Sequence, residues 1–154
     1  ISRALPNARI ICLRRHPADS VLSNYRQLFA TGFSYYNYAY DLVDTAEYYV
    51  RFDALVAAFR ASLPADRFTE VWYEDVVSDL EAQARRLVDF CSLDWQPECV
   101  EFHRYAAPVA TASSAQVRQP LYSSSVGRWT RVRSHMADAL GVLEANGLLD
   151  DAQE

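Results

Sequence analysis

The chain has 154 residues, of which 51% are hydrophobic and 23% charged, and its formal net charge is −5. This length corresponds to about one domain of roughly 100–200 residues, and the composition excludes a disordered, collagen-like or low-complexity chain. No apolar run approaches the roughly 18 residues of a membrane-spanning helix, and the first residues do not resemble a secretory signal. We therefore expect residues 1–154 to belong to a single domain that has no membrane partner.

The first expected elements are a strand and a helix. Ala8–Leu13 is a short, Ile-rich apolar run, typical of a parallel strand that is buried on both faces. Pro17 stands where a helix can begin, because the N–H that proline lacks has no partner in the first turn. Val21, Leu22, Tyr25 and Leu28–Phe29 then fall at helical spacing.

The connection Thr31–Tyr40 is unusually aromatic, because five of its ten residues are Phe or Tyr. Two interpretations stay open at this point. The segment is either a loop that packs on the core, or a wall of the acceptor-substrate site or contact surface for a partner.

A long helix and a second strand follow. Leu42, Ala46, Tyr49, Val56 and Phe59 fall at helical spacing and predict an amphipathic helix over Asp41–Ala61. Phe68–Tyr73 reads as a strand. Ser78 and Glu81 fit a capping box at the start of the next helix, whose apolar face is formed by Leu80, Ala84, Leu87, Val88 and Cys91.

The C-terminal third has fewer periodic segments. We expect a turn at Leu93–Trp95, a short helix over Pro97–His103, a loop over Tyr105–Ser125 and a helix over Gly127–Ala145. Strands that alternate with helices indicate an α/β fold with a parallel sheet. Two strands are few for a complete sheet of this kind, so we expect the chain to be the C-terminal part of a larger domain.

Two features of the composition bear on chemistry. All fifteen basic residues are Arg, so a P-loop lysine cannot lie in this chain. The three cysteines have no paired spacing, which predicts no metal site and favours a reducing, cytoplasmic setting.

Basic residues are concentrated near the C-terminus. Residues 102–137 contain five Arg and no Asp or Glu, although the whole chain is acidic. A basic block in an acidic protein indicates an anionic ligand. The alternative is a solvated loop whose arginines pair with acids elsewhere in the fold.

The end of the first strand is a candidate anion site. Ligands of open α/β sheets bind beyond the carboxyl ends of the strands. Arg15 stands there, directly before a helix whose free N-terminal amides favour negative charge. Ser23 lies eight residues further on, and a phosphate could touch both side chains.

Three segments in order resemble sulfotransferases that use 3′-phosphoadenosine-5′-phosphosulfate. RRHPADSVLSNY is similar to their 3′-phosphate motif through Arg15, Pro17, Asp19, Ser23 and Tyr25, although His16 replaces the usual Asp. The resemblance implies that Arg15 and Ser23 contact the 3′-phosphate.

The other two segments resemble the adenine and loop motifs of the same family. VWYEDVVSDLEAQARRLVDFCSLDW implies an adenine contact from Tyr73. TASSAQVRQPLYSSSVGRW resembles the loop that closes over the adenosine 3′-phosphate. It implies cofactor contacts from Thr111, Ser113, Ser114, Arg118 and Arg128.

The resemblance implies a fold and an activity. The nearest group is the bacterial sulfotransferases that are often fused to tetratricopeptide repeats and are similar to tyrosylprotein sulfotransferases. The implied fold is a three-layer, P-loop NTPase-like sulfotransferase fold, here mostly helical and without its P-loop-like strand-loop-helix. The implied reaction moves a sulfuryl group from 3′-phosphoadenosine-5′-phosphosulfate to a hydroxyl or amine acceptor and leaves adenosine 3′,5′-bisphosphate.

The same resemblance places the 5′-phosphosulfate loop and the catalytic base upstream of Ile1. We therefore assign no catalytic residue in this chain and expect it to be inactive alone. The expected partners are a small-molecule or protein acceptor, the upstream part of the same protein, possible tetratricopeptide repeats, and a second copy through an exposed sheet edge. The alternative function is a non-catalytic nucleotide- or protein-binding module derived from the fold. No nucleic-acid-binding motif is present, so we expect no nucleic-acid partner.

Overall fold

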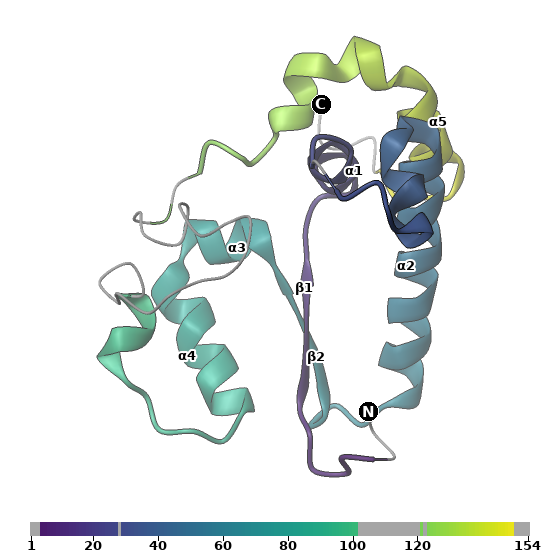
Figure 1. Cartoon of the computed structure of the whole chain (residues 1–154). Helices are drawn as coiled ribbons and strands as arrows, with labels where there is room; N and C mark the ends of the chain where they lie inside the picture. The colour runs from purple at the N-terminus through teal and green to yellow at the C-terminus, as the bar shows by residue number, and fades with distance from the viewer. Residues whose placement is uncertain (1–3, 28, 102–120, 122, 150–154) are drawn as a thin grey trace. The chain divides into compact units, whose positions relative to one another are not determined.

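The computed structural model describes residues 4–27, 29–101, 121 and 123–149. The chain forms two compact units, one from residues 1–13 and 65–123 and the other from residues 14–64 and 124–154. Figure 1 traces both units, and each is described by itself below.

The first unit contains a two-stranded parallel sheet. Strand β1 (Ile10–Arg14) pairs with β2 (Phe68–Trp72), and the Ile10 amide donates to the Arg67 carbonyl at 2.8 Å. Phe68 and Val71 are buried, whereas Ile11 and Leu13 are 39% and 60% exposed. The prediction that both faces of the first strand are buried is therefore wrong for this structure, in which one row of its side chains faces solvent.

Three helical segments complete the described part of this unit: α3 (Tyr73–Ser78), α4 (Leu80–Phe90) and the 3-10 helix η2 (Pro97–Val100). The predicted capping box is displaced by one residue, because Ser78 is still part of α3. Asp79 caps α4 instead, and its carboxylate accepts from the Ala82 amide at 3.0 Å. Aspartate is as good an N-cap as serine, so the sequence offered two adjacent starts.

The second unit is helical. It consists of α1 (Pro17–Tyr25), η1 (Ser34–Tyr40), α2 (Leu42–Ser62), η4 (Arg128–Met136) and α5 (Ala137–Ala145). The helices α2 and α5 lie side by side, and α1 packs against α2 (Figure 1). The facing sides of α1, α2, α5 and η4 form one core of Ala18, Val21, Leu22, Ala46, Tyr49, Trp129, Met136, Ala139, Leu140 and Leu143.

Two predicted helices of this unit have different outcomes. The long helix is confirmed as α2, and Asp41 caps it by accepting from the amides of Val43 and Asp44 at 2.7 and 3.1 Å. The single helix expected over Gly127–Ala145 is wrong. Its first part is the 3-10 helix η4, and non-helical backbone at Val132 separates turns within it.

The α/β class is confirmed, because the chain contains a small parallel sheet and is otherwise mostly helical. Within the residues that the structure describes, no helix is both long and apolar enough to cross a membrane.

Candidate functional site

Helix α1 begins directly after the paired arginines at the end of β1. Pro17 occupies its first turn and is buried together with Ala18, which anchors the helix N-terminus in the core of the second unit. His16 precedes Pro17, and its ring stacks on the Trp129 ring at 5.4 Å with an angle of 7°. The start of α1 is thus fixed against η4.

The two consecutive arginines point to different surroundings. The Arg14 side chain is only 4% exposed and pairs with the Asp53 carboxylate of α2. Burial by itself lowers the pKa of the Arg14 guanidinium, but hydrogen bonds and charge interactions with Tyr49 and Asp53 raise it above its usual value. Arg14 therefore stays charged and has a structural role. Arg15 has a side chain that is 22% exposed.

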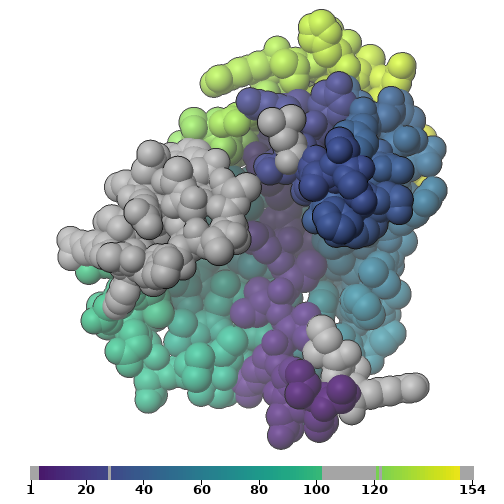
Figure 2. Space-filling model, viewed as in Figure 1, coloured from purple at the N-terminus to yellow at the C-terminus, as the bar shows by residue number. Residues whose placement is uncertain are grey.

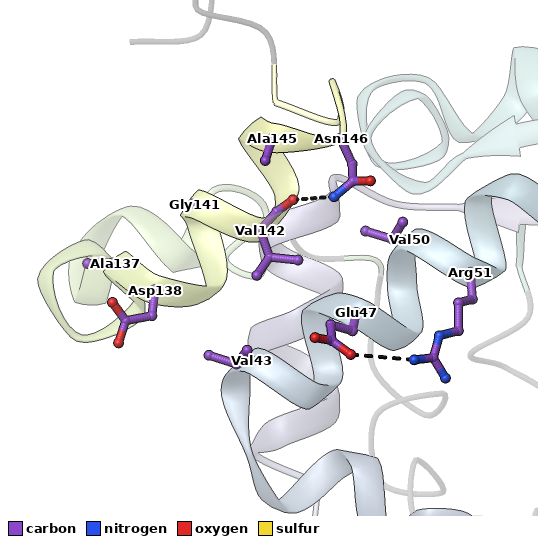
Figure 3. Close-up of a pocket in the computed structure, with 10 residues that line it drawn as sticks. All are labelled: Val43, Glu47, Val50, Arg51, Ala137, Asp138, Gly141, Val142, Ala145 and Asn146. Atoms are coloured by element: carbon purple, nitrogen blue, oxygen red, sulfur yellow. Dashed lines mark hydrogen bonds and ion pairs between the residues drawn. The ribbon is translucent and has the colours of Figure 1, made fainter.

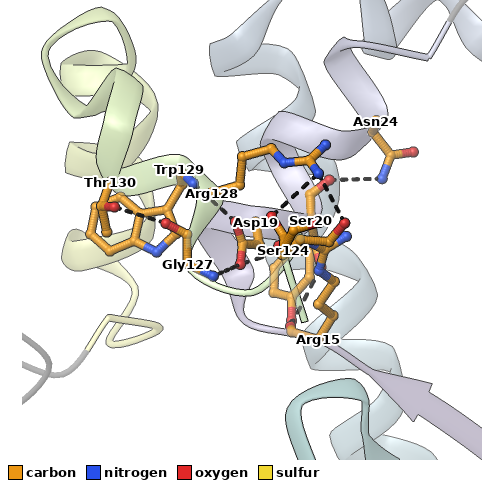
Figure 4. Close-up of polar contacts among 11 residues, drawn as sticks. Arg15, Asp19, Ser20, Asn24, Ser124, Gly127, Arg128, Trp129 and Thr130 are labelled. Carbon is orange, nitrogen blue, oxygen red and sulfur yellow. Dashed lines mark hydrogen bonds and ion pairs between the residues drawn. The ribbon is translucent and has the colours of Figure 1, made fainter. Parts of the chain in front are cut away.

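Asp19 connects α1 to the start of η4. Its side chain is fully buried, and its two carboxylate oxygens accept from the backbone amides of Gly127 and Trp129 at 2.7 and 3.0 Å. Gly127 has a φ of +66°, a left-handed conformation that glycine adopts without strain. One carboxylate thereby holds a turn that lies more than one hundred residues away in the sequence (Figure 4).

Arg15 and Arg128 meet at Ser125. The Arg15 guanidinium donates to the Ser125 carbonyl, 110 residues further along the chain. The Arg128 guanidinium donates to the Ser125 hydroxyl at 3.1 Å and to the Ser124 carbonyl at 3.3 Å. Two permanently charged groups thus converge on one short loop segment, as Figure 4 shows for Arg15, Ser124 and Arg128.

Hydrogen bonds from α2 and α1 hold the Arg15 backbone. The Tyr49 hydroxyl donates to the Arg15 carbonyl at 3.0 Å, and the Ser20 hydroxyl donates to the same oxygen at 3.4 Å. Asp19 lies 3.7 Å from the Arg15 guanidinium and balances part of its charge. Arg15 is therefore held at both its backbone and its side chain.

The chemistry of this cluster favours an anion. The guanidiniums of Arg15 and Arg128 outnumber the single buried carboxylate, and the N-terminal amides of α1 add positive potential. Guanidinium groups match the oxygens of a phosphate in bidentate geometry. In the described residues, no group of three or more His, Cys, Asp and Glu side chains could hold a metal ion.

The other predicted site residues have different locations. Ser23 lies on α1 and is exposed, and Tyr73 is the half-buried first residue of α3 in the other unit. Thr111, Ser113, Ser114 and Arg118 lie outside the described residues.

Sequence reasoning assigned no contact to Asp19, Ser125 or Gly127. In the sequence, Asp19 stands out only as a matching position of the first motif. Its burial on the first turn of α1 is what identifies it, because a carboxylate that is buried needs hydrogen-bond donors. The turn could have been predicted from Gly127, because a glycine directly before Arg128 is typical of a turn.

A groove of about 800 Å³ lies elsewhere in the second unit, between α2 and α5 (Figure 3). Small side chains of α5 and the Glu47–Arg51 ion pair of α2 form its walls. Arg15 and Arg128 do not line it, so the groove is separate from the anion site.

Comparisons with known proteins point to one family. A model described as the sulfotransferase family matches residues 1–97, which include α1 and Tyr73 but not Arg128. A protein of Aquifex aeolicus (strain VF5), named as an uncharacterized protein, is 31% identical over 139 residues. The alignment covers 90% of this chain and 18% of that relative, so the chain spans less than a fifth of the relative's length.

Proposed function

Because this chain belongs to the sulfotransferase family, we propose that it holds the 3′-phosphate and adenosine of 3′-phosphoadenosine-5′-phosphosulfate for sulfuryl transfer. The observation that carries the proposal is the convergence of Arg15 and Arg128 on Ser125. Both guanidiniums now donate to oxygens of the loop. A phosphate at this place offers stronger, charge-assisted acceptors to the same two groups.

The remaining cofactor residues have roles in the same proposal. Ser23, exposed on α1, adds a hydroxyl donor for the 3′-phosphate, and Tyr73 stacks on the adenine. Further cofactor contacts come from Thr111, Ser113, Ser114 and Arg118, which precede Ser125 in the sequence.

The proposed reaction transfers a sulfuryl group from the nucleotide donor to the acceptor. The acceptor hydroxyl or amine attacks sulfur, the bond between sulfur and the 5′-phosphate oxygen breaks, and the acceptor proton passes to a base. The products are the sulfated acceptor and adenosine 3′,5′-bisphosphate. Positively charged groups that hold the departing nucleotide stabilise the negative charge that develops on it.

The proposal extends to the protein that contains this chain. Its sheet belongs to a three-layer, P-loop NTPase-like domain whose other strands and 5′-phosphosulfate loop come from the rest of the protein. It acts in the cytoplasm on a small-molecule or protein acceptor, and a second copy is a candidate partner.

Nucleotide discrimination tests the proposal directly. Isothermal titration calorimetry of the chain compares adenosine 3′,5′-bisphosphate with adenosine 5′-monophosphate, which differs only by the 3′-phosphate. We expect the bisphosphate to bind at least tenfold more tightly, because two guanidiniums recognise the additional phosphate. Equal affinities for the two nucleotides would contradict the assignment of Arg15 and Arg128 to a 3′-phosphate site.

A second test concerns Tyr73. If its ring stacks on adenine, Tyr73→Ala is expected to weaken binding of adenosine 3′,5′-bisphosphate about 5- to 150-fold, because aromatic stacking on a base contributes roughly 1–3 kcal/mol. Binding of inorganic phosphate should not change, since phosphate has no ring. Trp72→Ala is the matched control, because it removes an exposed aromatic side chain next to Tyr73. Equal losses for nucleotide and phosphate would remove Tyr73 from the site.

A further inference from the structure

An aromatic surface covers part of the second unit. It consists of Phe33, Tyr35, Tyr36, Tyr38 and Tyr40 of the η1 region and Tyr48 of α2. Residues of the η1 region stand out on the face of the molecule shown in Figure 2, where they are dark blue. This is the segment for which the sequence left core packing and partner contact open.

The structure shows features of both interpretations. The backbone of η1 is anchored, since Ala39 is buried and the Thr45 hydroxyl donates to the Tyr38 carbonyl at 2.8 Å. The Tyr40 hydroxyl donates to the Phe29 carbonyl at 3.3 Å. The rings, however, remain accessible. Tyr35 is 63% exposed and Tyr48 49% exposed.

The rings are already arranged against one another. Tyr38 stacks on Tyr48 with ring centres 3.8 Å apart and an angle of 5°, and Tyr35 contacts Tyr36 at 4.4 Å. Tyr36 also stacks on Phe29 at 4.5 Å. A ligand that binds here therefore meets ordered rings and has to immobilise few side chains, which lowers the entropic cost of binding.

The acids of this segment outnumber its bases, although Glu47 pairs with Arg51. Between Arg26 and Arg51 the chain contains no basic residue and three acids, Asp41, Asp44 and Glu47. Asp44 precedes Tyr48 by four residues on α2, so the two side chains lie on the same side of the helix. Carboxylates beside exposed aromatic faces attract cations and repel anions.

We propose that the aromatic surface binds a basic polypeptide segment through its Arg and Lys side chains. Guanidinium and ammonium groups bind to the faces of aromatic rings and pair with carboxylates such as Asp44. The rings extend over η1 and α2, so an extended chain can engage several of them at once, whereas a single small amine occupies one. Anionic lipids and nucleic acids are disfavoured here by Asp41 and Asp44, since the third acid, Glu47, pairs with Arg51.

This inference does not rest on the proposed function, and its test uses no nucleotide. Fluorescence anisotropy measures binding of a labelled peptide of four Arg-Ser repeats to the chain at about 0.15 M salt. A peptide of four Glu-Ser repeats should not bind. Tyr48→Leu and Asp44→Asn are each expected to weaken the Arg-Ser peptide about two- to fivefold, in line with exposed cation–π and ion-pair interactions.

Two control variants separate the surface from the net charge of the chain. Phe59→Leu removes a half-exposed ring from the far end of α2, and Glu144→Gln removes an exposed carboxylate from α5. Both should bind the Arg-Ser peptide like the wild type. Asp44→Asn preserves the rings, so it tests the surface even if Tyr48→Leu alters folding.

Three outcomes would overturn the proposal. The first is equal weakening by Glu144→Gln and Asp44→Asn, which would mean that the peptide senses only overall charge. The second is absence of binding by the Arg-Ser peptide at millimolar concentration. The third is binding of phosphatidylserine vesicles that Tyr48→Leu abolishes, which would make the surface a membrane contact.

Discussion

Replacing Arg15 by alanine is expected to weaken binding of adenosine 3′,5′-bisphosphate by about 10- to 100-fold. A charge-assisted hydrogen bond contributes roughly 1.5–3 kcal/mol, and each 1.4 kcal/mol changes a dissociation constant tenfold. The side chain is partly exposed, and one of its present partners is a loop carbonyl that an anion can replace. Isothermal titration calorimetry measures the change directly.

Arg131→Ala is the matched control for this prediction. Arg131 is exposed on η4, three residues after Arg128, so its removal changes the net charge equally. It should alter affinity by less than about threefold, as expected for a distant exposed charge. If Arg15→Ala and Arg131→Ala have the same small effect, the anion binds elsewhere and only the general field of the basic segment attracts it.

The double variant Arg15→Ala/Arg128→Ala adds a sharper criterion. Groups that contact one ligand oxygen cluster are coupled, so their effects on binding free energy should not add. We expect the double variant to lose less affinity than the product of the two single losses. Strict additivity would indicate two independent sites.

Replacing Asp19 by asparagine is expected to reduce both stability and nucleotide affinity. The carboxylate is fully buried and accepts two backbone hydrogen bonds, whereas an amide offers one acceptor oxygen and directs an NH₂ group at the other backbone N–H. Hydrogen bonds to charged groups contribute roughly 1.5–3 kcal/mol each, so the loss in unfolding free energy should be about 3 kcal/mol. This corresponds to a decrease in Tm of roughly 6–12 °C for a chain of this length.

The loss of nucleotide affinity should follow from a change in the turn that carries Arg128. When the backbone amides of Gly127 and Trp129 lose their hydrogen bonds to residue 19, the turn that they form is released. Arg128 then no longer stays beside Arg15. We expect Asp19→Asn to weaken adenosine 3′,5′-bisphosphate at least fivefold when measured well below the Tm of the variant. Glu144→Gln, an exposed carboxylate on α5, should change neither Tm nor affinity. A variant of Asp19 that unfolds early but binds normally would limit this residue to a purely structural role.

Local sequence patterns were enough to predict several parts of the fold. The spacing of Leu42, Ala46 and Tyr49 predicted α2, and Asp41 caps it within one residue of the expected start. Pro17 indicated the first turn of α1, because the N–H that proline lacks would have no hydrogen-bond partner there. The paired strands and the position of Arg15 before a helix were also readable, because each depends on residues that are neighbours in the chain.

Other local predictions were incomplete where two choices were nearly equal in free energy. The start of α4 shifted from Ser78 to Asp79, two residues that cap helices equally well. The helix expected after Gly127 became a 3-10 helix with a break at Val132, which the apolar spacing of Trp129, Val132 and Met136 did not indicate. Hydrophobic periodicity reports which face is buried and does not determine every hydrogen bond along the backbone.

The arrangement of the candidate anion site depends on contacts across the fold. Arg14 and Arg15 are the same residue type and are adjacent in sequence. Arg14 nevertheless pairs with the Asp53 carboxylate on α2, whereas Arg15 donates a hydrogen bond to the Ser125 carbonyl. No local pattern distinguishes the two arginines, because their different surroundings come from distant partners. The partner of Arg14 lies 39 residues away in the sequence, and the Ser125 carbonyl lies 110 residues from Arg15. Asp19 likewise acquires its role only when packing of η4 against α1 buries its carboxylate and presents two backbone amides to it. Residue types and local spacing thus predicted that cations stand at a helix N-terminus, whereas tertiary packing determined which of them are buried as ion pairs and which remain accessible to a ligand.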